Sequence, residues 1–227
     1  AYMTVNPSDF LTRESLAERA KKINMKRALP WPQDPWQGDT IWMGCIDSEG
    51  RTASFIQSVF WEFGSGVVCP STGVMWQNRG ISFSLKEDAL HRLEPGRKPF
   101  HTLNPAMARF KDGRSMVYGT MGGEGQPQTQ AAVFSRYALF NQPLQTAVTA
   151  PRWLLGRTWG EQSTTLKLES RFEQELVQQL RDAGHVLEVL PEAFSDTMGH
   201  AGAVVRHPNG MMEGAADPRS DGAVACV

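Results

Sequence analysis

Thr40 is the residue in this sequence whose position is best suited to chemistry. A threonine hydroxyl is a weak nucleophile unless a base lies beside it, and one available base is the α-amine of the same threonine once the preceding peptide bond is cut. That amine has a pKa of about 7.7–8.0, so it can take and return the hydroxyl proton at neutral pH. Thr40 opens a strand-like segment directly after a proline-rich connector over 30–39. The connector could be cut and move away without disturbing a core, although a threonine at a strand start is usually structural.

Other kinds of site find less support in the sequence. The histidines are His91, His101, His185, His200 and His207. They form no HExxH or similar ligand spacing, and there is no GxxxxGK phosphate loop. The cysteines Cys45, Cys69 and Cys226 stand singly, so no CxxC pair or disulfide framework is indicated. We expect reduced thiols, no metal and no cofactor.

Composition narrows the class of protein. The chain has 227 residues, a formal net charge of −1, 41% hydrophobic and 21% charged residues, which is typical of a globular protein. The charge balance argues against nucleic-acid binding and against a polybasic membrane surface, and no apolar run is long enough to span a bilayer. The start lacks both a Met and a signal-peptide pattern, so we expect a piece of a longer protein, cytoplasmic, with the periplasm left open.

Three hairpins are predicted to carry the candidate residues. Strands over 41–47 and 52–58 flank a turn at Asp47–Gly50. A second pair lies over 106–110 and 115–120, around Lys111-Asp112-Gly113, and a third over 203–206 and 211–215, around Pro208-Asn209-Gly210. Each turn ends on a glycine where a positive φ is needed. The hairpins predict antiparallel sheet.

Helices are predicted before and between these hairpins. Thr12 can cap a helix with Leu16, Ala17, Ala20 and Ile23 at helical spacing. A second helix is predicted over 129–141, and a third follows a capping box at Ser170–Glu173, with Phe172, Leu176 and Leu180 on one face and Gly184 at its end. The fold class is therefore α+β, an antiparallel sheet covered by helices.

A series of short motifs follows in order along the chain: Gly38-Asp39-Thr40, Asp47-Ser48-Glu49-Gly50, Phe63-Gly64-Ser65-Gly66, Pro105, Gly122-Gly123 and Asp217-Pro218-Arg219-Ser220. Together they resemble the γ-glutamyltranspeptidase family of N-terminal-nucleophile hydrolases. The resemblance implies a proenzyme that cuts itself before Thr40 and a four-layer αββα sandwich shared between a large and a small subunit. Residues 1–39 would be the tail of the large subunit with its linker, and 40–227 the small, catalytic subunit.

The resemblance also assigns the catalytic positions. Thr40 matches the nucleophile, and the Asp39–Thr40 bond matches the cleavage site. Ser58 stands where the family usually has a threonine whose hydroxyl orients the nucleophile. Gly122 and Gly123 match the pair whose backbone N–H groups form the oxyanion hole, and without a Cβ both amides can turn toward the developing charge. Asp217–Ser220 is expected to brace the site rather than to react.

The substrate-binding positions depart from the family. Phe60 replaces an asparagine, Arg79 and Ser82 replace a glutamine and an aspartate, and His101 and Thr102 replace two serines. The family's aspartate pairs with a substrate ammonium, whereas an arginine binds a carboxylate. We therefore expect a small amide with a free carboxylate and no amine.

The segments 76–80, 100–105, 120–128 and 150–153 resemble the oxamate amidohydrolase branch of the family. The implied partners are a large subunit from the same precursor, in an αβ heterodimer that can itself dimerise, and a small-molecule amide. Several alternatives stay open: Arg79 as an interdomain ion pair, and His101 as a structural residue. The whole protein is alternatively a γ-glutamyl hydrolase or transferase acting on glutathione-like substrates, or an uncut binding protein.

Overall fold

The computed structural model describes residues 12–21, 40–156 and 163–226. The chain divides into two units, Ala1–Gln37 and Gly38–Val227. In the first unit the described element is helix α1, Arg13–Ala20. The Thr12 hydroxyl accepts a hydrogen bond from the backbone N–H of Ser15 at 3.1 Å, which confirms the predicted cap. Ile23, the proline-rich connector and Asp39 lie outside the described residues, so the division between subunits at Asp39–Thr40 stays a prediction.

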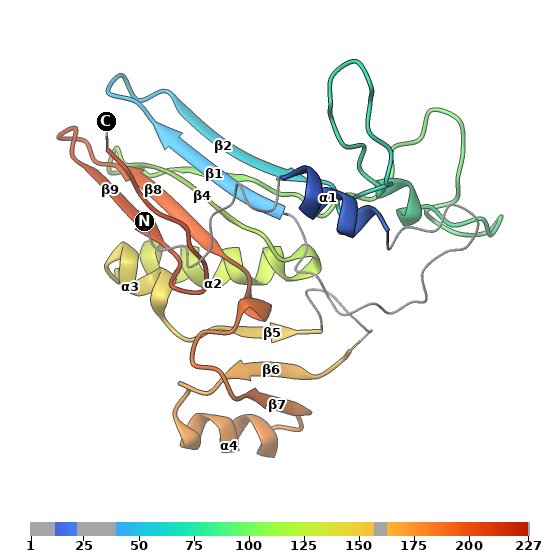
Figure 1. The fold of residues 1–227 in the computed structure, drawn as a ribbon. Helices are drawn as coiled ribbons and strands as arrows, with labels where there is room; N and C mark the ends of the chain where they lie inside the picture. The colour runs from blue at the N-terminus through green and yellow to red at the C-terminus, as the bar shows by residue number, and fades with distance from the viewer. Residues whose placement is uncertain (1–11, 22–39, 157–162, 227) are drawn as a thin grey trace. The chain divides into compact units, whose positions relative to one another are not determined.

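A four-stranded antiparallel sheet forms the centre of the second unit (Figure 1). Its order is β3-β4-β8-β9, with β3 at Ala106–Arg109, β4 at Ser115–Thr120, β8 at Ala201–Arg206 and β9 at Met212–Ala216. Two of the predicted hairpins, β3–β4 and β8–β9, are confirmed. Gly113 and Gly210 adopt φ values of 91° and 85° in their turns, which only glycine takes readily.

The remaining predicted hairpin packs on this sheet as a separate layer. Strands β1, Thr40–Ile46, and β2, Thr52–Ser58, pair with Thr40 opposite Ser58. Trp42 points from β1 into the layer below, where its indole lies on the backbone of Gly119 in β4 and Gly202 in β8. A Cβ at either glycine would fall less than 3.0 Å from the ring. The close contact between the two layers therefore depends on these two glycines.

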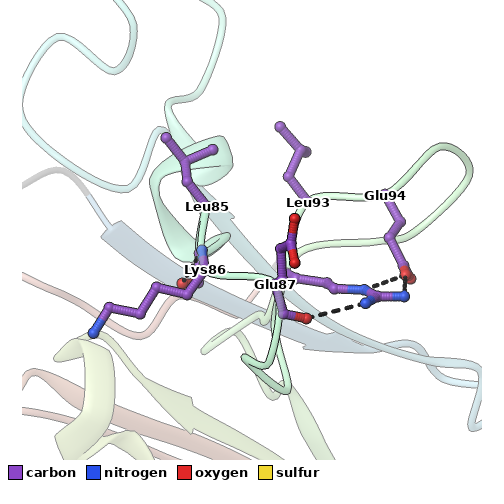
Figure 2. A pocket seen from close by; sticks show the side chains of 7 residues that line it. Leu85, Lys86, Glu87, Leu93 and Glu94 are labelled. Carbon is purple, nitrogen blue, oxygen red and sulfur yellow. Dashed lines mark hydrogen bonds and ion pairs between the residues drawn. The ribbon is translucent and has the colours of Figure 1, made fainter.

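A long connection over 59–105 joins β2 to β3. It contains the 3₁₀ turn η2, Arg79–Ser82, and two isolated bridges, Val68 to Met75 and Ser84 to Arg92. A shallow hollow of about 450 Å³ lies in this connection, lined by residues 84–87 and 92–94 (Figure 2). None of the predicted site residues lines it.

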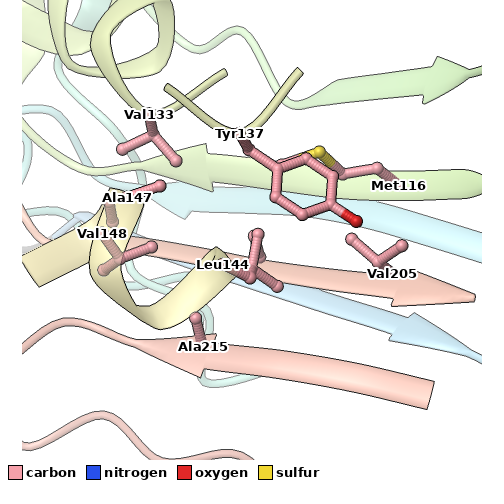
Figure 3. Close-up of a cluster of buried hydrophobic side chains, with 10 residues drawn as sticks. Met116, Val133, Tyr137, Leu144, Ala147, Val148, Val205 and Ala215 are labelled. Atoms are coloured by element: carbon pink, nitrogen blue, oxygen red, sulfur yellow. The ribbon is translucent and has the colours of Figure 1, made fainter. Parts of the chain in front are cut away.

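Helices cover the opposite face of the four-stranded sheet. They are α2, Gln126–Ala138, and α3, Leu144–Thr149. Figure 3 shows Val133 and Tyr137 of α2 and Leu144 of α3 packed over Met116 and Val205 of the sheet. Helix α2 begins and ends three residues earlier than predicted, because the 3₁₀ turn η3, Gly123–Gly125, leads directly into it.

A third sheet was not predicted. It has the order β5-β6-β7, with β5 at Trp153–Leu155, β6 at Leu166–Glu169 and β7 at Leu187–Leu190. Strand β6 runs parallel to β7, and helix α4, Gln174–Asp182, connects them. The 3₁₀ turn η4, Asp196–Met198, precedes β8.

The predicted start and buried face of α4 were wrong. Glu173 is the N-cap residue and makes no side-chain capping bond, so the capping box at Ser170–Glu173 does not form. The buried face also differs from the predicted one: Val177 is 1% exposed, whereas Leu176 is 41% exposed. The predicted end at Gly184 is confirmed by its φ of 94°.

The fold class is α+β, as predicted. Helices, a four-stranded sheet and the β1–β2 hairpin form successive layers in the second unit (Figure 1). These are three of the four layers expected from the resemblance. The outward side chains of the β1–β2 hairpin remain exposed, among them Ile41 at 56%, Met43 at 44% and Phe55 at 52%.

Candidate active site

Strand ends from the β1–β2 hairpin and from the four-stranded sheet converge on one cavity. Strand β1 begins and β2 ends there, and so do the end of β4, the start of β8 and the end of β9. The cavity, which we call the Thr40 cavity, has a volume of about 840 Å³. Its lining includes Thr40, Ser58, Met121, His200 and Asp217. Two of these, Thr40 and Ser58, are predicted catalytic residues.

The hydroxyls of Thr40 and Ser58 contact each other directly. Antiparallel pairing places the two residues opposite one another, and their oxygens lie 2.8 Å apart. Ser58 Oγ also accepts a hydrogen bond from the backbone N–H of Phe60 at 2.9 Å. Ser58 Oγ keeps a second lone pair, so either hydroxyl can be the donor, and in one of the two arrangements Ser58 donates to Thr40 Oγ1. A donated hydrogen bond of this kind stabilises negative charge on the threonine oxygen.

Phe60 links the Thr40–Ser58 pair to the other predicted substrate-binding residues. Its φ of 80° is unusual for a residue with a side chain, and strain of this kind is common at functional sites. The Arg79 guanidinium lies over the Phe60 ring with its Cζ 3.8 Å from the ring centroid. Arg79 Nη1 donates to Thr102 Oγ1 at 3.2 Å. The structure therefore brings Phe60, Arg79 and Thr102 together.

Arg79 is a buried cation without a recorded counter-charge. It is 2% exposed, and no ion pair among the described residues involves it. Burial lowers the pKa of Arg79, although a guanidinium stays charged at neutral pH. The alternative role as an interdomain ion pair finds no partner in the described part of the chain.

The other two predicted binding residues lie at the edges of this group. Partial burial and the charge of Arg79 lower the pKa of His101, whose Nδ1 accepts a hydrogen bond from the Leu103 N–H at 3.3 Å. Ser82 ends the turn η2 that Arg79 begins, and it makes no hydrogen bond to the other candidates in the described residues.

Gly122 and Gly123 follow β4 directly and precede α2. Their φ values are 124° and 50°, and Gly122 O accepts the bond that closes η3, from the Gly125 N–H at 2.8 Å. Neither glycine N–H donates to another group in the described part of the chain. The neighbouring Met121 lines the Thr40 cavity. Neither glycine lines that cavity, so the oxyanion hole stays a prediction.

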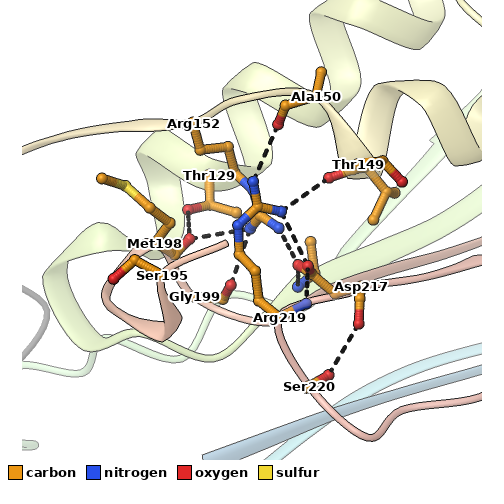
Figure 4. Close-up of polar contacts among 12 residues, drawn as sticks. Thr129, Thr149, Ala150, Arg152, Ser195, Met198, Gly199, Asp217, Arg219 and Ser220 are labelled. Atoms are coloured by element: carbon orange, nitrogen blue, oxygen red, sulfur yellow. Dashed lines mark hydrogen bonds and ion pairs between the residues drawn. The ribbon is translucent and has the colours of Figure 1, made fainter. Parts of the chain in front are cut away.

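A buried charge cluster holds the strand ends (Figure 4). Arg152, Glu169, Asp217 and Arg219 are each at most 7% exposed. Arg219 Nε donates to Glu169 Oε1 at 2.6 Å, and its Nη1 donates to Asp217 Oδ1 at 3.0 Å. Arg152 Nη2 pairs with Asp217 Oδ2. The expected bracing role of Asp217 and Arg219 agrees with these contacts.

Arg152 and Glu169 were not singled out in the sequence. Leu154 and Leu168, close to them in the sequence, are apolar and buried. A single charged residue within such an apolar segment is a weak sequence signal for a buried charge. Burial lowers the pKa of Arg152 to about 10 despite the charge of Asp217. For Arg219 the loss of solvent is outweighed by the hydrogen bonds that it donates to Glu169 and by the charge of Asp217, so its pKa is raised.

The described residues also bear on metal sites, membrane-spanning helices and the cysteines. No cluster of three or more His, Cys, Asp or Glu side chains able to hold a metal occurs within 12–21, 40–156 and 163–226. In the same ranges, no helix is long and apolar enough to cross a membrane. Cys45, Cys69 and Cys226 are free thiols.

Comparison with known proteins gives consistent matches. A family model described as gamma-glutamyltranspeptidase matches residues 1–227. The oxamate amidohydrolase proenzyme of Klebsiella pneumoniae subsp. pneumoniae is 57% identical over 99% of this chain and 42% of its own length. The glutathione hydrolase-like YwrD proenzyme of Bacillus subtilis is 44% identical over 88% of this chain and 38% of its own length. The chain thus spans about two fifths of these relatives.

Solved structures agree on the fold. Cephalosporin acylase from Bacillus halodurans has a TM-score of 0.68 and 32% identity, covering 98% of this chain and 40% of that one. Gamma-glutamyltranspeptidase from Pseudomonas nitroreducens has a TM-score of 0.66 and 24% identity, covering 82% of this chain and 98% of that one.

Proposed function

Because the chain belongs to the gamma-glutamyltranspeptidase family, we propose that it is the catalytic part of a self-processing amidohydrolase with Thr40 as the N-terminal nucleophile. The observation that carries the proposal is the contact of 2.8 Å between the hydroxyls of Thr40 and Ser58, two of the residues that line the Thr40 cavity. The Phe60 N–H in turn holds the Ser58 oxygen, which fixes the position of the pair at the strand ends.

Processing comes first in the proposed mechanism. The Thr40 hydroxyl adds to the carbonyl carbon of Asp39, the C–N bond breaks, and the proton passes to the new α-amine, which leaves an ester on Thr40 Oγ1. Water then hydrolyses the ester, freeing the Asp39 carboxylate and the Thr40 hydroxyl. Ser58 supports the attack by donating a hydrogen bond to the oxygen as negative charge forms on it.

Turnover uses the free α-amine. In the mature protein the amine accepts the hydroxyl proton of Thr40 as the oxygen attacks the substrate carbonyl. Gly122 and Gly123 N–H groups receive the developing oxyanion, and the proton moves to the leaving nitrogen as the C–N bond breaks. Water then hydrolyses the acyl ester on Thr40.

The substrate we propose is a small amide with a carboxylate, such as oxamate. Arg79 supplies a buried positive charge with no counter-ion in the described residues, and Thr102 and Phe60 fix its direction. A carboxylate would supply the missing counter-charge. The name of the relative with 57% identity points to the same substrate.

A partner subunit completes the proposed enzyme. The relatives are proenzymes of which this chain spans about two fifths. The exposed face of the β1–β2 hairpin, with Ile41, Met43 and Phe55, is suited to burial against another layer. We propose that the rest of the precursor covers it, giving an αβ heterodimer.

The test uses the full-length precursor. A denaturing gel of the mature protein should resolve two bands, and N-terminal sequencing of the smaller should begin Thr-Ile-Trp-Met. Ammonia release from oxamate should require Thr40. An active enzyme with the Asp39–Thr40 bond intact would refute the mechanism, and a permanently uncut, inactive chain would favour the binding-protein alternative.

A γ-glutamyl hydrolase or transferase is the second candidate, favoured by the name of the 44% identical relative. It predicts faster hydrolysis of glutathione or a γ-glutamyl anilide than of oxamate. An α-ammonium beside Arg79 would be repelled, and for that reason we rank it second.

A further inference from the structure

Asn78 has no part in the mechanism above, although it immediately precedes Arg79 and stands at the N-cap position of η2. An asparagine at such a position usually accepts a hydrogen bond from a backbone N–H of its own turn. Here the side chain makes no such bond. Its Oδ1 accepts instead from the N–H of Trp61, which lies 17 residues earlier in the chain, at 3.2 Å. The half-buried side chain of Asn78 therefore joins two segments of the connection over 59–105.

Two hydrogen bonds of Asn78 hold the two peptide groups on either side of Phe60. The N–H of Asn78 donates to Val59 O at 3.2 Å, and this oxygen belongs to the peptide group that precedes Phe60. The Trp61 N–H, which donates to Asn78 Oδ1, belongs to the peptide group that follows. Because peptide groups are planar, fixing both of them restricts the φ and ψ of the residue between them. A side-chain-bearing residue at a φ of 80° persists only where its surroundings hold it, and Asn78 supplies two such contacts.

The first of these peptide groups reaches the Thr40–Ser58 pair. Its oxygen, on Val59, accepts from Asn78. Its nitrogen, on Phe60, donates to Ser58 Oγ at 2.9 Å. One planar unit thus connects Asn78 with the Ser58 oxygen, which lies 2.8 Å from Thr40 Oγ1. A rotation of this unit would turn the Phe60 N–H away from Ser58.

The Phe60 side chain extends the same connection to Arg79. Arg79 marks the acyl side of the proposed site, where the substrate carboxylate would bind, and its Cζ lies 3.8 Å from the Phe60 ring centroid. Since Arg79 follows Asn78 directly, one residue holds the backbone of both partners in this contact. If Phe60 relaxed to a negative φ, its Cβ and ring would change direction relative to the backbone, and Arg79 would lose the ring beneath it.

We propose that Asn78 is a positioning residue that acts through the backbone of Phe60. It keeps the Ser58 oxygen beside the Thr40 hydroxyl, and it keeps the Arg79 guanidinium over the Phe60 ring. The inference rests on the proposed function. Loss of the Asn78 side chain should therefore impair self-cleavage, which uses Ser58, as well as turnover of oxamate, which uses both Ser58 and Arg79.

The experiment compares variants of the full-length precursor. Asn78→Ala removes the acceptor for the Trp61 N–H, and Asn78→Asp keeps an oxygen at that position. Self-cleavage is followed on denaturing gels during cell-free synthesis, and kcat/KM for oxamate is measured on fully cleaved protein. Self-cleavage alone is the readout for Asn78→Asp, because a new carboxylate next to Arg79 in the sequence changes the charge that the substrate meets.

The matched control is Asn209→Ala, in the turn between β8 and β9. Asn209 Oδ1 also accepts a hydrogen bond from a backbone N–H, that of Met211 at 3.0 Å, and its side chain is exposed. This variant loses the same kind of contact at a residue outside the proposed site. Arg79→Gln serves as a second comparison, because it should lower kcat/KM without slowing self-cleavage.

We expect Asn78→Ala to slow self-cleavage at least about threefold and to lower kcat/KM for oxamate at least about tenfold. Asn78→Asp should cleave itself within about twofold of the wild-type rate, and Asn209→Ala should change neither quantity. If Asn78→Ala does not fold by circular dichroism, Asn78→Ser replaces it, since its hydroxyl is too short to reach the Trp61 N–H.

Two results would overturn the positioning role of Asn78. One is self-cleavage of Asn78→Ala slowed by less than about threefold, which is the behaviour expected of Arg79→Gln. The other is self-cleavage of Asn78→Asp as slow as that of Asn78→Ala, which would show that the acceptor oxygen is not the cause. A wild-type precursor that stays uncut or releases no ammonia from oxamate refutes the proposed function instead.

Discussion

Replacing Arg79 by glutamine in the full-length precursor should separate substrate binding from folding. Removing one partner of a buried charge pair costs about 2–5 kcal/mol, much of it from the charge left alone. Since about 1.4 kcal/mol is a factor of ten, kcat/KM for oxamate should fall by about thirtyfold to a few thousandfold. Self-cleavage should persist, because the chain itself holds the Asp39–Thr40 bond in place.

The effect of Arg79→Gln on stability should be small for a reason visible in the contacts. The variant loses the hydrogen bond to Thr102, worth about 0.5–1.5 kcal/mol, and the contact with the Phe60 ring, worth about 0.5–2 kcal/mol. It also removes a buried charge that has no counter-ion among the described residues, which offsets part of that loss. At about 2–4 °C per kcal/mol the two lost contacts correspond to about 2–14 °C, and removal of the unpaired charge should bring the change in Tm toward the lower end of that range.

The assay is steady-state ammonia release from oxamate, with Tm and the gel of processing as separate readouts. Arg97→Gln, at a partly exposed arginine of the same connection, is the matched control and should leave all three unchanged. Loss of the Arg79 charge should also raise the pKa of His101 toward its usual value, in part only, because burial remains. If kcat/KM stays within about twofold while Tm falls steeply, Arg79 is structural and the assignment of the acyl side is wrong.

Three further predictions follow from other contacts. Thr40→Ala should abolish both cleavage and ammonia release while leaving a folded precursor by circular dichroism; residual turnover above background would place the nucleophile elsewhere. Asp217→Ala should lower the free energy of unfolding by about 3–5 kcal/mol in denaturant titration, because it leaves the Arg152 charge buried and unpaired, and a change below about 1 kcal/mol would contradict this. Hydrogen bonds from Ser71 and then Thr72 lower the pKa of the Cys69 thiol to about 7, so alkylation of Cys69 should be half-maximal near pH 7 and should shift to higher pH in Ser71→Ala. An unchanged alkylation profile in that variant would exclude the hydroxyl as the cause.

The elements that the sequence predicts well are those with a local physical signal. Each of the three hairpins has a glycine at a positive-φ turn position between alternating strands, and all three form as predicted. The third sheet has no such signal. Its strands are three or four residues long, too short for a period of two to stand out, and β6 pairs with β7 across helix α4 instead of a tight turn.

The residues of the candidate site also differ in how far local sequence signals predict their positions. Thr40 and Ser58 stand at the ends of two strands joined by a tight turn, so the register that places them opposite each other follows from that turn. The contact of Arg79 with Phe60 and Thr102 depends on a long connection without a regular repeat, and only the family resemblance pointed to these residues.

The proposed nucleophile and the proposed substrate-binding residues lie on different kinds of structure, and this has a consequence for specificity. Thr40 and Ser58 belong to the β1–β2 pair, which packs against the central sheet through Trp42. The buried charge cluster holds the adjoining strand ends. Arg79 and Thr102 belong to the connection over 59–105, which has few regular elements. Substitutions in that connection can change which acyl group is bound without moving the Thr40 hydroxyl. This would explain why Arg79 and Thr102 depart from the family pattern while Thr40 matches it.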